Sequence, residues 1–151
     1  MTGYEVVKTS ARDGSLPIEE TVLQKLFPAG YKLEWNQRIR LLSLLQIDPP
    51  HILAQEHFTK NEWNILIALL VSYPQYAPHE ILLASVTSLS VDDCRTRLQK
   101  ARQRGTQALK RELKPVQRAL CGIRVKIINL SPHLRVALIR DAGYMLTRCS
   151  A

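Results

Sequence analysis

The sequence has few cysteines and no long apolar run. Its three cysteines, Cys94, Cys121 and Cys149, make an odd and widely spaced set, which is not the pattern of a disulfide framework. No apolar run is long enough to cross a bilayer, and the first fourteen residues are polar and lack the apolar core of a signal peptide. We therefore expect a soluble protein of the reducing cytoplasm.

Residue patterns for catalysis and metal binding are also missing. The four histidines do not combine with the three cysteines at zinc-ligand spacings. There is no glycine-rich phosphate loop and no G-x-S-x-G motif. The adjacent Asp92 and Asp93 are better explained as negative charge at the start of a helix than as an acid–base pair. The sequence predicts no enzyme, no cofactor and no metal.

What the sequence does have is one strong concentration of positive charge. Residues 95–118 hold nine Lys or Arg and a single acid, Glu112, so their balance of +8 equals the formal net charge of the whole chain. The rest of the chain sums to zero. A focused basic stretch indicates a polyanionic partner, most commonly nucleic acid. The stretch contains no aromatic residue, which argues against stacking on the bases of a single strand.

The same region has the pattern of an amphipathic helix. Ser90 and Asp93 resemble a capping box with Asp in place of Glu or Gln. Small and apolar residues recur at steps of three and four from Cys94 to Leu109, which predicts a helix over about 91–109. Its other faces carry Arg and Gln, the side chains that pair bidentately with base edges in the DNA major groove. The alternative for such a run is a solvated surface helix.

The region before residue 51 is expected to be mostly helical. We predict a flexible tail over 1–15 and a helical extension over 16–50, which would serve dimerisation or docking. Within the extension, acids and a proline favour a short helix from about residue 17. The apolar spacing predicts a second helix over 33–46, ended by the prolines at 49 and 50.

Residues 51–151 are expected to form one domain. After a short strand at 52–54, Thr59 and Glu62 form a T-x-x-E capping box that starts a helix ending near residue 72. A short helix over about 78–86 and then the basic helix complete a helix-turn-helix layout.

Downstream of the basic helix we expect a short helix from Pro115 to Gly122. The alternation of apolar and basic residues over 123–127 predicts a strand. Two further strands, at 135–139 and 144–147, would form a terminal hairpin. Helices followed by such a hairpin indicate an α+β, mainly α, winged helix-turn-helix with an N-terminal helical extension and a C-terminal β-hairpin wing.

Over residues 57–147 the sequence resembles the winged-helix effector domain of OmpR/PhoB-type response regulators. The resemblance is carried by Thr59 with Glu62, by the Pro74 break followed by Glu80-Ile81-Leu82, by the acidic and then Arg-rich run 92–104, and by Ile139-Arg140-Asp141-Ala142-Gly143-Tyr144-Met145-Leu146.

The sequence departs from that family's pattern in four respects. Asp141 stands where the family has a glycine, an insertion spans 114–134, and the family's N-terminal antiparallel sheet is replaced by the helices predicted above. No receiver domain is present, so the resemblance implies DNA binding without phosphorylation control.

The resemblance also implies roles for individual residues. Arg97, Lys100, Gln103 and Arg104 would reach base edges or nearby phosphates, and the wing at about 135–147 would contact the flanking backbone or minor groove. Three further arginines would contribute backbone or minor-groove contacts: Arg95 and Arg102 on the helix and Arg140 in the wing. Arg135 would extend the phosphate surface, although a strand arginine alone is equally explained as the solvated face of a sheet.

We therefore expect a homodimeric, sequence-specific double-stranded DNA-binding protein that regulates transcription, with its helix at about 91–109 in the major groove. Residues 16–50 could also hold a protein partner. Two alternatives remain open. The fold could be a protein-interaction or assembly module whose basic face docks an acidic partner, or it could be an RNA-binding module.

Overall fold

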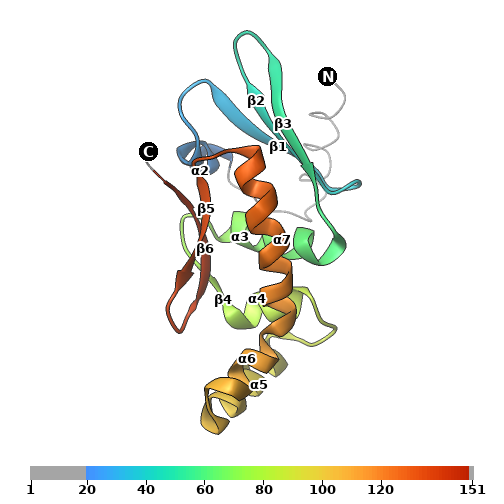
Figure 1. The fold of residues 1–151 in the computed structure, drawn as a ribbon, viewed down its shortest axis with the longest axis vertical. Helices are drawn as coiled ribbons and strands as arrows, with labels where there is room; N and C mark the ends of the chain where they lie inside the picture. Colours follow the sequence, from blue (N-terminus) through green and yellow to red (C-terminus); the bar gives the residue numbers. More distant parts are fainter. Residues whose placement is uncertain (1–19, 150–151) are drawn as a thin grey trace.

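The computed structural model describes residues 20–149, and the predicted tail at 1–15 and the predicted helix start near residue 17 lie outside them. The fold is α+β, with two small antiparallel sheets and α-helices as the larger share (Figure 1). The elements are α2 (Glu20–Leu23), a 3-10 turn η1 (Gln24–Leu26), β1 (Tyr31–Asn36), β2 (Leu41–Gln46), β3 (His51–His57), α3 (Lys60–Ser72), β4 (Ala77–Pro78), α4 (His79–Ser85), α5 (Val91–Arg104), α6 (Thr106–Glu112), α7 (Lys114–Leu130), β5 (Leu134–Ile139) and β6 (Gly143–Arg148).

The first sheet lies where a helix was predicted. β1, β2 and β3 pair antiparallel in that order, and the register sets Leu33 against Leu44 and Trp35 against Leu42. These four side chains are buried on one face of the sheet, because successive strand residues alternate between faces. The predicted helix over 33–46 is therefore wrong, and the described part of the extension is helical only in α2 and η1. β3 is also longer than the strand expected at 52–54.

The reason for this error is a tight turn between two apolar runs. The N–H of Arg38 donates to the Asn36 Oδ1 at 3.1 Å, a local bond typical of turns. Arg40 has a φ of 54°, which a helix does not allow. The apolar residues on either side fit a helical spacing as well as a strand spacing, so only the turn and the pairing distinguish the two.

The predicted α3 is confirmed, including its cap. The Thr59 Oγ1 accepts from the Glu62 N–H at 3.3 Å, and the Glu62 Oε1 accepts from the Thr59 N–H at 3.0 Å. Trp63 is buried and its Nε1 donates to the Gln37 Oε1 at 2.8 Å, which ties the β1–β2 turn to this helix. α3 thus connects the first sheet to the rest of the core.

Residues 114–130 form one helix, so the predicted short helix ending at Gly122 and the predicted strand over 123–127 are both wrong. Ile123 and Ile127 are four residues apart and both buried, which suits a helix as well as an alternating strand. Gly122 lies inside α7, where glycine is normally a poor helix former. The absence of a side chain there leaves room for the Glu62 carboxylate of α3, which a Cβ would displace. The Lys126 Nζ donates to the Glu62 Oε1 at 2.6 Å, so Glu62 ties α3 to α7.

The second sheet has the order β4-β6-β5, and the two strands of the predicted hairpin are confirmed. Its tight turn contains Asp141 with a φ of 61°, a conformation that Asp tolerates better than most residues. Gly143 is required because a Cβ there would collide with the Ala77 carbonyl of β4. One continuous hydrophobic core joins both sheets, α3, α4 and α7.

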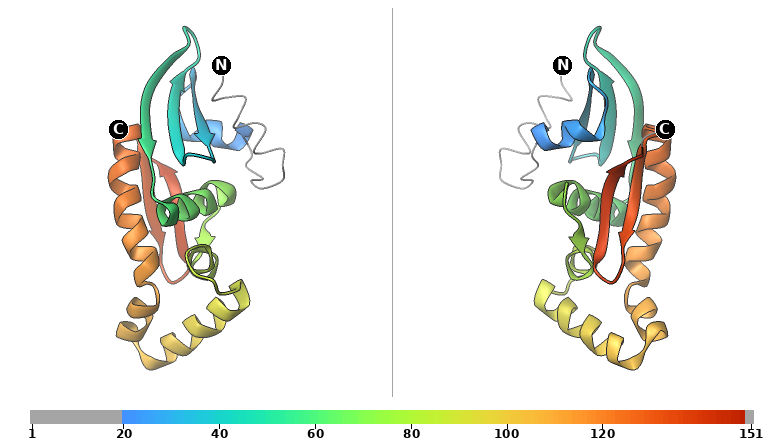
Figure 2. Two further views of the ribbon diagram at one scale, coloured as in Figure 1. Left: turned by 90° about the vertical axis from the view of Figure 1, so that its right-hand side faces the viewer. Right: turned by 90° about the vertical axis from the view of Figure 1, so that its left-hand side faces the viewer.

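The elements are arranged along one long axis. The first sheet occupies one end of the molecule, and α5 with α6 occupies the opposite end (Figures 1 and 2). α7 runs between the two ends and packs against α3, β3 and β5. The turn of the β5–β6 hairpin is directed toward the end that holds α5 and α6 (Figure 1).

Candidate nucleic-acid interface

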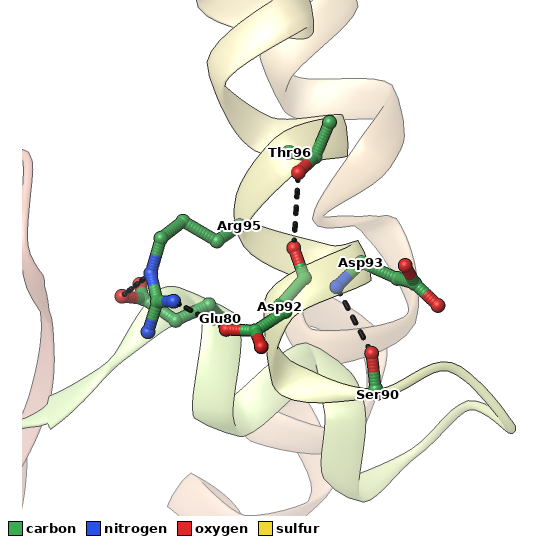
Figure 3. Close-up of polar contacts among 6 residues, drawn as sticks. All are labelled: Glu80, Ser90, Asp92, Asp93, Arg95 and Thr96. Atoms are coloured by element: carbon green, nitrogen blue, oxygen red, sulfur yellow. Dashed lines mark hydrogen bonds and ion pairs between the residues drawn. The ribbon is translucent and has the colours of Figure 1, made fainter.

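The basic stretch forms two helices and the start of a third. The Ser90 Oγ accepts from the Asp93 N–H at 3.0 Å and caps the N-terminus of α5 (Figure 3). α5 then ends at Arg104 because Gly105 has a φ of 117°, a value that side chains other than hydrogen rarely allow. The helix predicted over about 91–109 is thus correct in its start and wrong in its end, which belongs to α6.

The predicted contact residues of α5 all lie on the protein surface. One face of the helix is buried through Cys94, Leu98 and Ala101, and α5 packs against α4 and α6. Six side chains predicted to contact DNA are exposed: Arg95, Arg97, Lys100, Arg102, Gln103 and Arg104.

These exposed side chains divide into three rows. An α-helix turns by about 100° per residue, so Lys100 and Gln103 lie on the side of α5 opposite its buried face. Gln99 lies at the edge of this outermost row. Two arginine pairs flank this outermost row on its two sides. Arg95 and Arg102 form one flank, and Arg97 and Arg104 form the other.

Two of the arginines are paired with carboxylates of the protein. The Arg95 Nη1 donates to the Asp92 Oδ1 at 2.7 Å, and its Nε donates to the Glu80 Oε2 at 3.4 Å (Figure 3). Arg97 donates to both carboxylate oxygens of Glu112, at 3.0 and 3.4 Å. The hydrogen bond and the charge of Glu112 raise the pKa of Arg97. Exposed ion pairs of this kind are weak and exchange readily with another anion.

The remaining cations of α5 are not neutralised in this way. Lys100, Arg102 and Arg104 make no ion pair or hydrogen bond through their side chains with any residue in 20–149. α5 therefore presents unpaired positive charge along its whole second half.

His79, the first residue of α4, contacts the β5–β6 hairpin. Its backbone N–H donates to the Ala142 carbonyl at 3.0 Å, and its buried ring meets the edge of Tyr144 at a centroid distance of 5.6 Å. Burial, and then the charge of Arg102, lower the pKa of His79. Arg140 is exposed in the turn of the same hairpin.

The structure does not bring Arg135 to this site. Arg135 lies at the start of β5, while the hairpin turn toward the basic end of the molecule lies at the end of that strand. Its Nη1 donates to the Pro132 and Leu134 carbonyls at 2.6 and 2.9 Å. Those contacts give Arg135 a local role at the strand entry.

Four exposed cations were left out of the predicted site: Lys110 and Arg111 of α6, and Lys114 and Arg118 of α7. Their signal was present in the sequence, because all four belong to the basic stretch 95–118. They were not assigned because the contact helix was expected to end near residue 109.

The interface is suited to electrostatic contact and hydrogen bonding. In the described part of the chain, no group of three or more His, Cys, Asp or Glu side chains is placed to hold a metal ion. Among residues 20–149, none of the helices combines the length and apolar character that a bilayer crossing requires.

Comparison with known proteins finds no matching family model, no similar curated protein and no similar solved structure.

Proposed function

We propose that the protein is a sequence-specific double-stranded DNA-binding protein that regulates transcription, built as a winged helix-turn-helix. In this proposal α4 and α5 form the helix-turn-helix, and the β5–β6 hairpin is the wing. The observation that carries the proposal is the group of exposed cations on α5, three of them unpaired within the described chain, at the end of the molecule toward which the hairpin turn points.

The fold supports the proposal at two further points. The sheet β1–β3 stands before the helices, where the resembled family also has an antiparallel sheet and where the sequence had suggested helices. The short strand β4 pairs with β6 and so fixes the hairpin beside α4. Two departures remain within residues 57–147, Asp141 in the hairpin turn and the presence of α6 and α7 between α5 and the hairpin.

Of the two long helices α5 and α7, α5 is the better candidate for the major groove. α7 directly precedes the hairpin, but the exposed positions of its second half carry no cation. Val125 is 64% exposed and Ile128 is 44% exposed, and neither can hydrogen-bond to a base edge. α5 instead exposes Lys100 and Gln103, which can.

The three rows of α5 suggest separate roles within a groove. Lys100 and Gln103, with Gln99, would face base edges. The flanks Arg95 with Arg102 and Arg97 with Arg104 would face the phosphates of the two strands that border the groove. Arg140 in the wing would contact the neighbouring backbone or minor groove.

The proposal is tested by selecting bound fragments from random duplex DNA and measuring their affinity over a salt series. With about six phosphate contacts, the log–log slope of affinity against salt is expected to be roughly −5. The triple variant R97A/K100A/R104A should lose most of the affinity. The matched control R38A/K60A removes two exposed cations outside the basic stretch and should bind like the wild type.

Two outcomes would reject the proposal. One is a flat salt response with no enriched sequence. The other is preference for structured RNA over duplex DNA at equal salt, which would instead support an RNA-binding module.

We also propose a homodimer, because a single module of this size reads few base pairs and two half-sites multiply specificity. Selected DNA should then contain an inverted or direct repeat. Sedimentation of the protein with that DNA should show two chains for each duplex, and one chain for each duplex would contradict the dimer.

A further inference from the structure

A second group of cations lies beyond the bend at Gly105. Lys110 and Arg111 of α6 and Lys114 and Arg118 of α7 are all exposed. Within residues 20–149 their side chains make no hydrogen bond and no ion pair. Four cations within nine residues repel one another, which favours an anionic partner.

The nearby acid does not neutralise this group. Glu112 is the single acid of residues 95–118, and its two oxygens accept from the Arg97 Nε and Nη2 at 3.0 and 3.4 Å. The carboxylate is therefore directed toward α5. The α6–α7 side keeps its full positive charge.

The four cations lie along the α6–α7 path, Lys110 and Arg111 before Leu113 and Lys114 and Arg118 after it. Leu113 is the cap that the two helices share: its N–H donates to the Leu109 carbonyl at 3.1 Å at the end of α6, and its carbonyl accepts from the Gln117 N–H at 2.9 Å at the start of α7. Lys114 and Arg118 are four residues apart on α7 and thus share a face.

The direction of this face is set by the core. Val116, Ala119 and Leu120 are buried, and they hold the opposite side of α7 against the rest of the protein. Beyond Arg118 the exposed positions of α7 carry no cation: they are Cys121, Val125, Ile128 and Asn129. The cationic surface is thus confined to α6 and the first turns of α7.

The bend at Gly105 sends α5 and the α6–α7 path in different directions (Figure 2). A single groove that receives the outer row of α5 cannot also receive this second face. We propose that Lys110, Arg111, Lys114 and Arg118 form a second phosphate-binding surface, which contacts the sugar-phosphate backbone of the same duplex outside the groove that α5 occupies. This inference rests on the proposed DNA binding and extends its footprint.

The test compares duplexes of two lengths that carry one half-site of the selected sequence, so that a second chain has no site of its own. One has about 10 base pairs, a single helical turn, and the other has about 20. The wild type should bind the longer duplex more tightly, and K110A/R111A/K114A/R118A should lose that gain. The salt slope on the longer duplex should become shallower by roughly 3 to 4, at about 0.9 for each lost phosphate contact.

A second measurement keeps the result independent of small folding effects. Ethylation of single phosphates in the flanking turn should weaken wild-type binding and leave the fourfold variant unchanged. R38A/K60A is the charge control, and matching thermal unfolding confirms that the variants are folded.

The outcomes separate the two proposals. If the wild type binds neither duplex, the proposed function fails and the second surface fails with it. If the wild type binds DNA but the fourfold variant keeps the length dependence and the ethylation pattern, the second surface alone is overturned.

Discussion

The Nε of Arg97 donates to the Oε1 of Glu112 at 3.0 Å across the bend at Gly105. The one acid of the basic stretch therefore links α5 to α6, and it holds an arginine that the proposed function needs for DNA phosphate. Phosphate and Glu112 are competitors for the same guanidinium.

Replacing Glu112 with Gln should therefore increase affinity for duplex DNA. The substitution removes a negative charge from the interface and frees Arg97, so we expect affinity to rise by roughly two- to tenfold at low salt, with a steeper salt slope. Fluorescence anisotropy over a salt series measures both quantities. Asp48→Asn, an exposed acid in the β2–β3 turn, is the matched control. Equal affinity for Glu112→Gln and wild type would show that the pair does not oppose binding.

Replacing Gln103 with Ala should change sequence preference more than general affinity. Gln103 lies on the outermost row of α5, where an amide can bond to a base edge. We expect a loss of about 1–3 kcal/mol on the preferred sequence, little loss on unrelated DNA and an unchanged salt slope. Repeating the fragment selection with the variant checks this. An equal loss on all sequences would place Gln103 on the backbone instead.

Replacing Gly122 with Ala should destabilise the protein, although alanine is normally the better helix former. A Cβ at this position would collide with the Glu62 carboxylate, so the Lys126 ion pair and the helix cap at Thr59 must shift. We expect a net loss of roughly 1–3 kcal/mol in the free energy of unfolding. Urea denaturation measures it, with the exposed neighbour Cys121→Ala as control. A more stable Gly122→Ala would contradict this packing.

Acid should weaken the fold through Glu62. Burial alone would raise the pKa of Glu62, but hydrogen bonds from Lys126 and Thr59 together with the Lys126 charge lower it below the ordinary value of 4.5. Because the folded pKa is lower than the unfolded one, this stability is present above pH 4.5 and is lost as pH falls through the folded pKa. Glu62→Gln should flatten that part of the pH profile of the unfolding free energy. A profile as steep as that of the wild type would assign the loss to other carboxyls.

His79 should add a second pH dependence at higher pH. Burial and the charge of Arg102 lower the pKa of His79 below 6.5, so the unfolded chain takes up this proton more readily than the folded protein. Stability should therefore be full above pH 6.5 and should decrease as pH falls toward the folded pKa. His79→Phe should remove that step, because phenylalanine has no titrating group. The His79 Nδ1 has no hydrogen-bond partner among the described residues, so the substitution breaks no hydrogen bond at that atom. A step that persists in His79→Phe would belong to another histidine.

The features that could be predicted from the sequence are those set by neighbours along the chain. The Thr59 cap is complete within four residues. The Ser90 Oγ likewise accepts from the Asp93 N–H, but the return bond from the Asp93 side chain that a capping box requires is not among the hydrogen bonds of residues 20–149. The concentration of charge in 95–118 is a property of composition, so the sequence alone predicts the exposed cations of α5. The strands of the hairpin are predicted from an aliphatic and β-branched run at 135–139, a turn at 140–143 and the strand expected at 144–147.

The features that failed depend on partners distant in the sequence. Residues 33–46 carry an apolar spacing that suits a helix, but the pairing of Trp35 with Leu42 and the burial of both make them strands. Residues 123–127 alternate like a strand, but they form part of the helix α7, which packs against α3. Ile123 and Ile127 are both buried in the core on that helix.

The sequence by itself therefore determined where the charge lies and where α3 and α5 begin, because capping and charge act within a few residues. Only the tertiary structure decided that α5 stops at Gly105 and that Glu112 turns toward Arg97. Only the tertiary structure, too, set the cations of α6 and α7 on a separate face. The physical reason is that the direction of a helix and the partner of a carboxylate are chosen by packing across the whole molecule, which local patterns do not encode.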